Sequence, residues 1–129
     1  MPHYTELIFG ATLHPDTPEY IINSVKYLCR TEGMERPYRF PFDPNGTNMI
    51  SGYGCKSKNA NCAFWYDEEE EAWHLSSRCS VVAYQNEILA FLLWIKPWIE
   101  SGSGSRGIYA MVLHEDWEEP DMYYLHEEI

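Results

Sequence analysis

The sequence predicts an α+β domain: an antiparallel sheet of about five to six strands with two helices packed on one face. Three observations support this class. The 129 residues suit a single domain, residues 1–129. Hydrophobic residues make up 45% and aromatic residues 16% of the chain, enough for a folded core. Strand-like runs follow one another between and after two helical segments, an order typical of an antiparallel sheet with helices on one side.

The first strand and the first helix are predicted near the N-terminus. Residues 6–13 have the composition of a strand. Asp16 and Glu19 have the spacing of a capping box, and Pro18 suits a first helical turn. Gly33 is the predicted C-cap. The apolar stripe of this helix is Ile21, Ile22, Val25, Leu28 and Cys29.

The middle of the chain predicts a β-hairpin. Residues 34–61 are interrupted by prolines and glycines, which exclude a long regular element and leave at most a short strand at 49–53. Aromatic-rich runs then stand on either side of five consecutive acids, residues 67–71. Such a pattern predicts two strands joined by an exposed turn, the second continuing to Val82.

The second helix is predicted over residues 84–100, with a kink or a loosened last turn at Pro97. A flexible Gly/Ser connector at 101–107 follows. Residues 107–114 and 122–126 are predicted as the last two strands. The helical stripe consists of Ile88, Phe91, Leu92, Ile95, Trp98 and Ile99.

The charge distribution argues for a basic partner. The net charge is −11, and residues 61–129 carry fourteen acids against three bases. This field repels nucleic acid and anionic membranes and attracts basic proteins. No run approaches the roughly 18 apolar residues of a membrane span, and the N-terminus lacks signal-peptide features. We therefore predict a cytoplasmic protein with reduced cysteines, no direct nucleic-acid partner and no membrane.

Metal and catalytic sites have weak support. Cys55, Cys62, His74 and Cys79 are zinc-ligand types, but their spacing departs from the close pairs of zinc sites. We predict no metal and no cofactor, while metal binding by these four residues stays an open question. No motif places a nucleophile beside a base, so no catalytic residue is assigned.

Two alternatives to a binding function stay open. The first is a small metal-dependent or His/carboxylate hydrolase that uses His14, His74 or His114, because all three histidines lie at or near predicted strand ends. The second is an oligomeric virion or assembly component with aromatic subunit contacts. The sequence does not choose between a monomer and a homodimer.

The acidic runs are the predicted binding residues. Two hairpin tips carry them, and aromatic side chains are interleaved with them. If both tips lie on one face, charge would steer a basic groove and the aromatics would hold it. In the competing interpretation, the acids only solubilise the tips and the aromatics fill the sheet's inner face. The predicted partner-binding residues are Asp67, Glu68, Glu69, Glu70, Glu71, Glu115, Asp116, Trp117, Glu118 and Glu119.

Residues 87–99 and 115–124, with the entry to the first helix at 11–18, resemble small acidic proteins of tailed phages and prophages. The resemblance implies a phage context, in which accessory proteins of this size often inhibit CRISPR effectors or restriction enzymes. It carries over no functional residues. The combined prediction is a non-enzymatic protein-binding module, which in the implied phage context is a phage-encoded inhibitor of a basic, nucleic-acid-binding host defence protein in the host cytoplasm.

Overall fold

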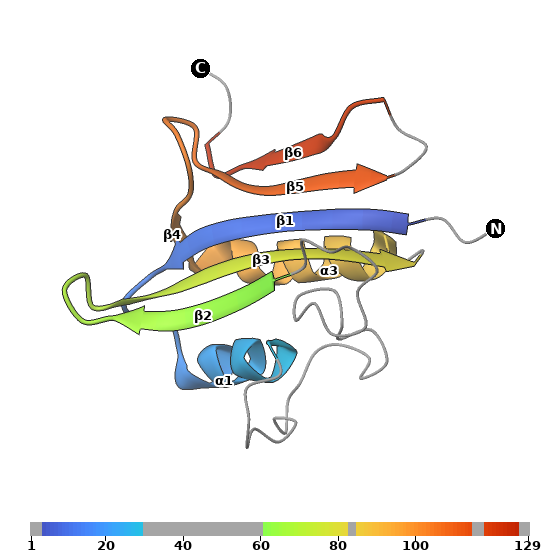
Figure 1. Ribbon diagram of the computed structural model, residues 1–129. Helices are drawn as coiled ribbons and strands as arrows, with labels where there is room; N and C mark the ends of the chain where they lie inside the picture. The colour runs from blue at the N-terminus through green and yellow to red at the C-terminus, as the bar shows by residue number, and fades with distance from the viewer. Residues whose placement is uncertain (1–3, 30–60, 83–84, 115–117, 127–129) are drawn as a thin grey trace.

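The structure is a computed structural model that describes residues 4–29, 61–82, 85–114 and 118–126 (Figure 1). The elements are β1 (Tyr4–Leu13), α1 (Glu19–Leu28), β2 (Asn61–Asp67), β3 (Ala72–Val82), α3 (Gln85–Ile95), the 3-10 turn η2 (Lys96–Trp98), β4 (Ile99–Ser101), β5 (Ile108–His114) and β6 (Asp121–Tyr124). The short strand predicted at residues 49–53 lies outside the described residues.

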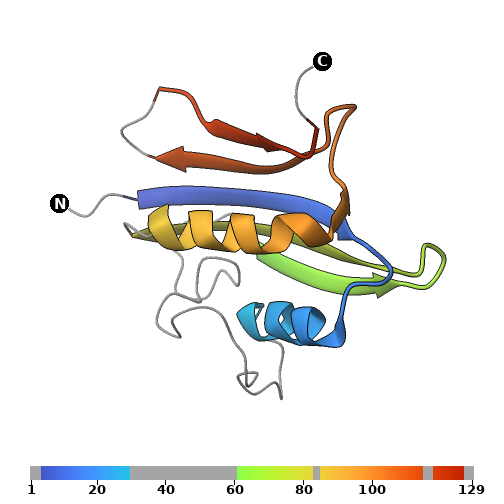
Figure 2. The same ribbon diagram turned by 180° about the vertical axis from the view of Figure 1, so that it is seen from behind.

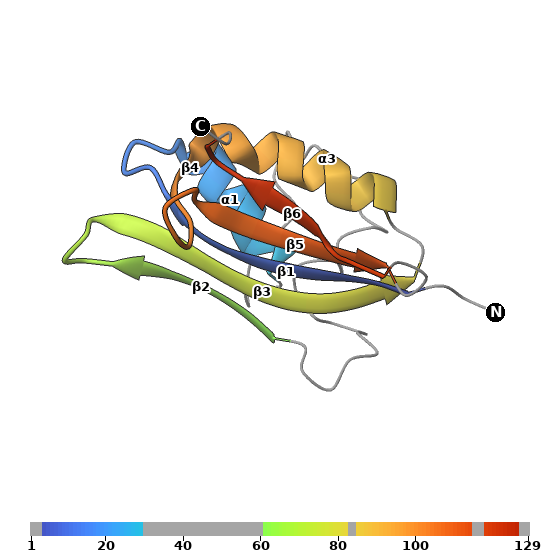
Figure 3. The ribbon, with the colours of Figure 1, turned by 90° about the horizontal axis from the view of Figure 1, so that it is seen from above.

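The predicted fold class is confirmed. The strands form one open sheet in the order β2-β3-β1-β5-β6, and β4 pairs with the end of β1. Every pairing is antiparallel. Both helices lie on the same face of the sheet (Figures 2 and 3). Among the described residues no helix covers the other face, the helix-free face, on which the candidate site lies.

The core lies between the helices and one face of the sheet. Leu7 and Phe9 of β1 alternate with Glu6 and Ile8, so only the first pair points toward the helices and is buried. Phe91 of α3 meets the edge of Phe9, with 5.5 Å between the ring centroids. The amphipathic stripe of α1 completes this core with Ile21, Ile22, Val25 and Leu28.

The ends of α1 differ from the prediction. The helix begins at Glu19 with Pro18 as its N-cap, and no side chain caps it. The predicted capping box is therefore wrong. Thr17 instead donates its hydroxyl to the carbonyl of His14, at 2.6 Å, which closes the turn after β1. The predicted C-cap is also wrong, because the helix ends at Leu28 with Cys29 as its C-cap.

The end of α3 confirms the loosened last turn at Pro97. The α-helix stops at Ile95, and Lys96–Trp98 continue as a 3-10 turn. The next residues form β4, which the sequence did not predict because Ile99 continues the apolar helical stripe. Ile99 is 5% exposed and pairs with Leu13, so its burial comes from the sheet.

The outer face of α3 is also apolar. Leu89 and Leu93 are 43% and 74% exposed. An oligomeric assembly component would use such a face, and this role stays a prediction. Neither helix in the described part of the chain is long and apolar enough to cross a membrane.

The two tyrosines between β5 and β6 predict a loss of stability at alkaline pH. Burial and then repulsion from Tyr123 raise the pKa of Tyr109 above 10.0. Burial and then the Asp121 carboxylate raise the pKa of Tyr123. Above pH 10 the unfolded chain loses these protons first, so the stability that is present below pH 10 falls as pH rises further. Urea unfolding between pH 9 and pH 11, roughly the range around an ordinary tyrosine pKa, measures the loss. A double Tyr109→Phe/Tyr123→Phe variant should lose less stability over this pH range. An equal loss would contradict the assignment of the effect to these two tyrosines.

Candidate functional site

Three side chains form a row across the helix-free face of the sheet. Trp65 of β2 is directly opposite His74 of β3, and His74 is directly opposite Thr12 of β1. Opposed residues of antiparallel strands point to the same face, so the three side chains are neighbours. The row lies close to the β2–β3 turn. Asp67, the last residue of β2, is two residues after Trp65 and therefore points to the same face.

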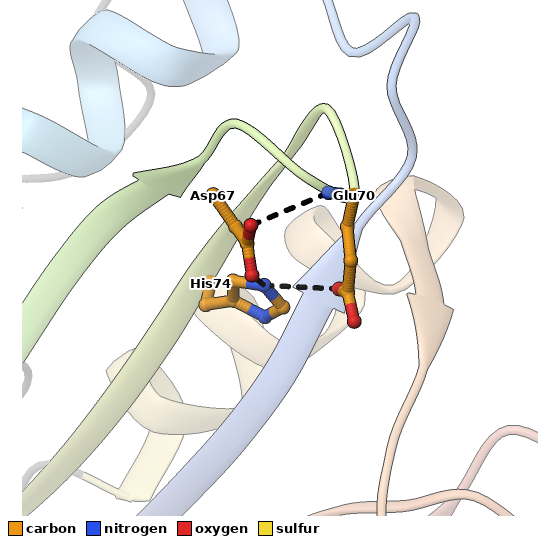
Figure 4. Close-up of side chains that lie close together, drawn as sticks. All are labelled: Asp67, Glu70 and His74. Atoms are coloured by element: carbon orange, nitrogen blue, oxygen red, sulfur yellow. Dashed lines mark hydrogen bonds and ion pairs between the residues drawn. The ribbon is translucent and has the colours of Figure 1, made fainter.

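The β2–β3 turn holds the acidic tip, defined as Asp67–Glu71. Asp67 Oδ1 accepts backbone hydrogen bonds from Glu69 at 2.9 Å and from Glu70 at 3.3 Å. Glu71 has a φ of 54°, a left-handed conformation that reverses the chain. Because these bonds occupy Oδ1, the other oxygen of Asp67 is left facing His74 (Figure 4).

His74 is held on both ring nitrogens. Its Nδ1 lies 2.8 Å from Thr12 Oγ1. Its Nε2 lies 3.1 Å from Glu70 Oε2 and 3.5 Å from Asp67 Oδ2. The Trp65 ring stacks on the imidazole, with 5.2 Å between centroids and 29° between planes. The His74 side chain is 17% exposed, while those of Asp67 and Glu70 are 33% and 60% exposed.

A shallow groove continues from this row along the helix-free face. It consists of two hollows of about 220 and 250 Å³ that share Gly10, Ser76 and Ser103 in their linings. Gly10 has no atom within 4 Å of where a Cβ would be, so the middle of the groove is open at this residue. The first hollow reaches Trp65 and His74 and is lined by the hydroxyl-bearing residues Thr12, Ser76, Ser101 and Ser103.

The predicted binding residues do not converge. Asp67, Glu68, Glu69, Glu70 and Glu71 lie together at the β2–β3 turn, whereas Glu118 and Glu119 lie just before β6. Glu115, Asp116 and Trp117 fall outside the described residues. The strand directions explain the separation. β3 and β5 are both antiparallel to β1 and therefore run in the same direction. The acidic tip precedes β3, whereas Glu118 and Glu119 come after β5, so these described parts of the two runs lie at opposite ends of the sheet (Figure 1). They do not form a single binding face.

The aromatic residues of the hairpin divide between the two faces. Trp65 is 48% exposed on the groove side. Trp73 points toward the helices, where it stacks on Phe64 at 4.6 Å and lies under Lys26 Nζ at 4.9 Å from its ring centroid. Tyr66 is opposite Trp73 and is 47% exposed. Trp65 is therefore the hairpin indole that is available beside the acidic tip.

The cysteine ligand set considered for zinc is divided by the sheet. Cys62 is opposite Ser77 on the helix side, while His74 is on the groove side. Cys62 instead pairs with Cys29: their hydrogen bond raises the pKa of the Cys29 thiol, and burial raises it further. The same bond lowers the pKa of Cys62 against the effect of burial. Cys55 lies outside the described residues. Cys62 and His74 cannot share one tetrahedral ion.

The other histidines of the hydrolase alternative lie elsewhere. His14 is exposed in the turn after β1, and His114 pairs with Thr5 at the far end of the sheet. Among the described residues, the one group of three metal-ligating side chains is Asp67, Glu70 and His74, whose ligand atoms all lie within 4.8 Å of one another. All three residues were named from the sequence, but no sequence pattern predicted that they lie together. A four-residue turn makes positions 67 and 74 diagonal neighbours on one face, and that spacing is the signal that could have found them.

Comparison with protein-family models, with curated proteins and with solved structures finds no match to this chain. The resemblance to phage proteins thus stays a prediction. The function has to be inferred from the hairpin and the groove themselves.

Proposed function

We propose that this domain binds a basic segment of a protein partner through the end of its β2–β3 hairpin. The observation that carries the proposal is the acidic tip, five consecutive carboxylates beside the half-exposed indole of Trp65 and the mouth of the groove. Anionic charge, an aromatic surface and hydrogen-bond acceptors therefore occur at one place. This is the combination that arginine and lysine side chains bind.

Charge supplies the attraction. The net charge of −11 gives the molecule a negative field, and the acidic tip concentrates part of it at one end of the sheet. Glu68, Glu69 and Glu71 are exposed, so their carboxylates can meet a cationic side chain without a large desolvation cost. Contacts of this type raise the association rate and make the affinity depend on salt.

Trp65 and the groove supply the holding contacts. The exposed part of the indole can stack against a guanidinium group. Planar guanidinium stacks on an aromatic ring better than the compact ammonium group of lysine does. Beyond it, the hydroxyls of Ser76, Ser101 and Ser103 can accept hydrogen bonds from an extended segment. The carboxylates thus explain attraction, and the indole and hydroxyls explain where the segment would lie.

The finer part of the proposal concerns the partner. Proteins that grip nucleic acid expose grooves lined with Arg and Lys, because phosphate contacts dominate their affinity. An acidic hairpin can compete for such a groove. The partner class is accordingly a basic, nucleic-acid-binding host defence protein, and the chain would act in the host cytoplasm as a phage-encoded inhibitor of the anti-CRISPR or anti-restriction type.

The test measures binding of a fluorescent oligo-arginine peptide by anisotropy, in a chelator-containing buffer at low and physiological salt. A double reversal, Glu68→Lys/Glu69→Lys, should weaken binding by about tenfold or more. Trp65→Ala should weaken the binding of an arginine peptide more than the binding of a lysine peptide, because guanidinium stacks better on the indole.

The matched control places the same charge change at the other end of the sheet, as Glu118→Lys/Glu119→Lys. It alters the net charge equally but leaves the acidic tip intact, so it should weaken binding by less than about threefold through the long-range field alone. Equal losses in both variants, or no peptide binding by the unmodified protein, would overturn the proposal.

A further inference from the structure

Asp67, Glu70 and His74 form a compact ligand group, and we propose that it binds a first-row divalent transition-metal ion, Zn²⁺ best of all. Asp67 is the last residue of β2, Glu70 lies in the β2–β3 turn, and His74 lies in β3 (Figure 4). This site goes beyond peptide binding, since it assigns a metal to two carboxylates of the acidic tip and leaves the exposed Glu68, Glu69 and Glu71 for a basic partner. The imidazole sets the group apart from an ordinary acidic run.

The distances match the edges of a zinc coordination shell. Bonds of about 2.0–2.1 Å in a tetrahedron place neighbouring ligand atoms roughly 3.3–3.4 Å apart. His74 Nε2 lies 3.1 Å from Glu70 Oε2 and 3.5 Å from Asp67 Oδ2. The carboxylate oxygens of Asp67 and Glu70 lie within 4.8 Å of each other, so a small movement of the exposed Glu70 closes the third edge.

The partners of His74 orient it for metal binding. Metal-ligating histidines usually donate the second ring N–H to a fixed acceptor, which sets the tautomer. Thr12 Oγ1 lies 2.8 Å from Nδ1 and can accept that proton. In that tautomer the lone pair of Nε2 would point at the space between one oxygen of Asp67 and one of Glu70, where a metal ion could bind all three ligand atoms.

The turn also holds Asp67 in place for this role. Its Oδ1 accepts the backbone N–H groups of Glu69 and Glu70, while Oδ2 faces His74. One oxygen is thus used for structure and the other is available as a ligand. Three protein ligands leave a fourth position, which would open toward the hollow lined by Trp65 and Ser76. One nitrogen and two oxygens favour Zn²⁺ over Mg²⁺, which prefers an all-oxygen shell.

The experiment is calorimetric titration of the metal-free full chain with Zn²⁺ alone, without peptide. We expect one site per chain, and we expect excess Mg²⁺ not to displace the zinc. Glu70→Gln should weaken zinc binding by about tenfold or more, because it removes a charged ligand while its 60% exposure leaves folding unaffected. His74→Gln should weaken it at least as much.

The matched controls change the same residue types outside the group. Glu69→Gln carries the same charge change one residue away, and His126→Gln removes an exposed histidine near the C-terminus. Both should leave the zinc affinity within about twofold, as expected of surface substitutions. Circular dichroism of each variant verifies the fold.

Three results would overturn the site: no zinc binding by the unmodified chain, an effect of Glu69→Gln equal to that of Glu70→Gln, or unchanged binding in Glu70→Gln. The last would place the zinc on thiols such as Cys29 and Cys62, on the opposite face. Because the peptide assay contains a chelator and the zinc titration contains no peptide, either proposal can fail while the other holds.

Discussion

Replacing Phe91 with alanine is expected to lower the free energy of unfolding by about 3–5 kcal/mol, the range for a phenylalanine removed from a packed core. Phe91 of α3 is 0% exposed, and its ring packs against β1 of the sheet. Its ring meets Phe9 at 5.5 Å and Trp94 at 6.1 Å between centroids. Truncation therefore removes both buried apolar area and aromatic edge contacts. Urea unfolding followed by circular dichroism measures the loss.

Leu93→Ala is the control for this prediction. Leu93 belongs to the same helix two residues later but is 74% exposed, so its truncation should change stability by no more than about 0.5 kcal/mol. Alanine is introduced into the same helix in both variants, and the two side chains that are removed differ mainly in their burial. A loss at Leu93 as large as that at Phe91 would show that α3 packs through its outer face.

Gly102→Ala is expected to cost about 1–3 kcal/mol, the range for forcing an extra methyl group into a packed site. A Cβ at this position would lie 2.4 Å from the carbonyl oxygen of Ile108 and 2.9 Å from the carbonyl carbon of Gly107. Both are backbone atoms. Ile108 is also tied to Ser103 by two backbone hydrogen bonds of 2.8 Å each, so it has little freedom to move away.

Gly10→Ala provides the opposite result. A Cβ at Gly10 meets nothing within 4 Å, and alanine in a strand interior restricts the unfolded chain more than glycine does. We therefore expect a gain of about 0.5–1 kcal/mol. Thermal unfolding of the two variants gives the comparison, and a shift in the same direction for both contradicts the strand geometry around the groove. Because Gly10 is shared by both hollows, Gly10→Val should also weaken peptide binding if the peptide enters the groove.

The confirmed predictions are those that rest on local periodicity. The stripe of Val25 and Leu28 specified α1, because a helix of that pattern has one face to bury. The two aromatic-rich runs around residues 67–71 specified the hairpin. The loosened turn at Pro97 follows from its missing N–H. Each of these requires only neighbours within a few positions along the chain.

The failures involve contacts that compete with the predicted local pattern. Asp16 and Glu19 have capping-box spacing, yet the Thr17 hydroxyl bonds to the carbonyl of His14 and Pro18 is the N-cap. Ile99 fits the helical stripe of the preceding segment, yet it pairs with Leu13 at the end of β1 and lies in a strand. The first competing contact is local, whereas the second comes from a strand far away in the sequence.

Spacing and composition were enough to predict the alternation of strands and helices, the acidic hairpin turn and the negative charge. The tertiary structure placed the acidic tip and the pair Glu118 and Glu119 at opposite ends of the sheet, because β3 and β5 run in the same direction on either side of β1. It also decided the surroundings of His74. Thr12 reaches that ring from 62 residues away, a proximity that strand register creates and that no local pattern encodes.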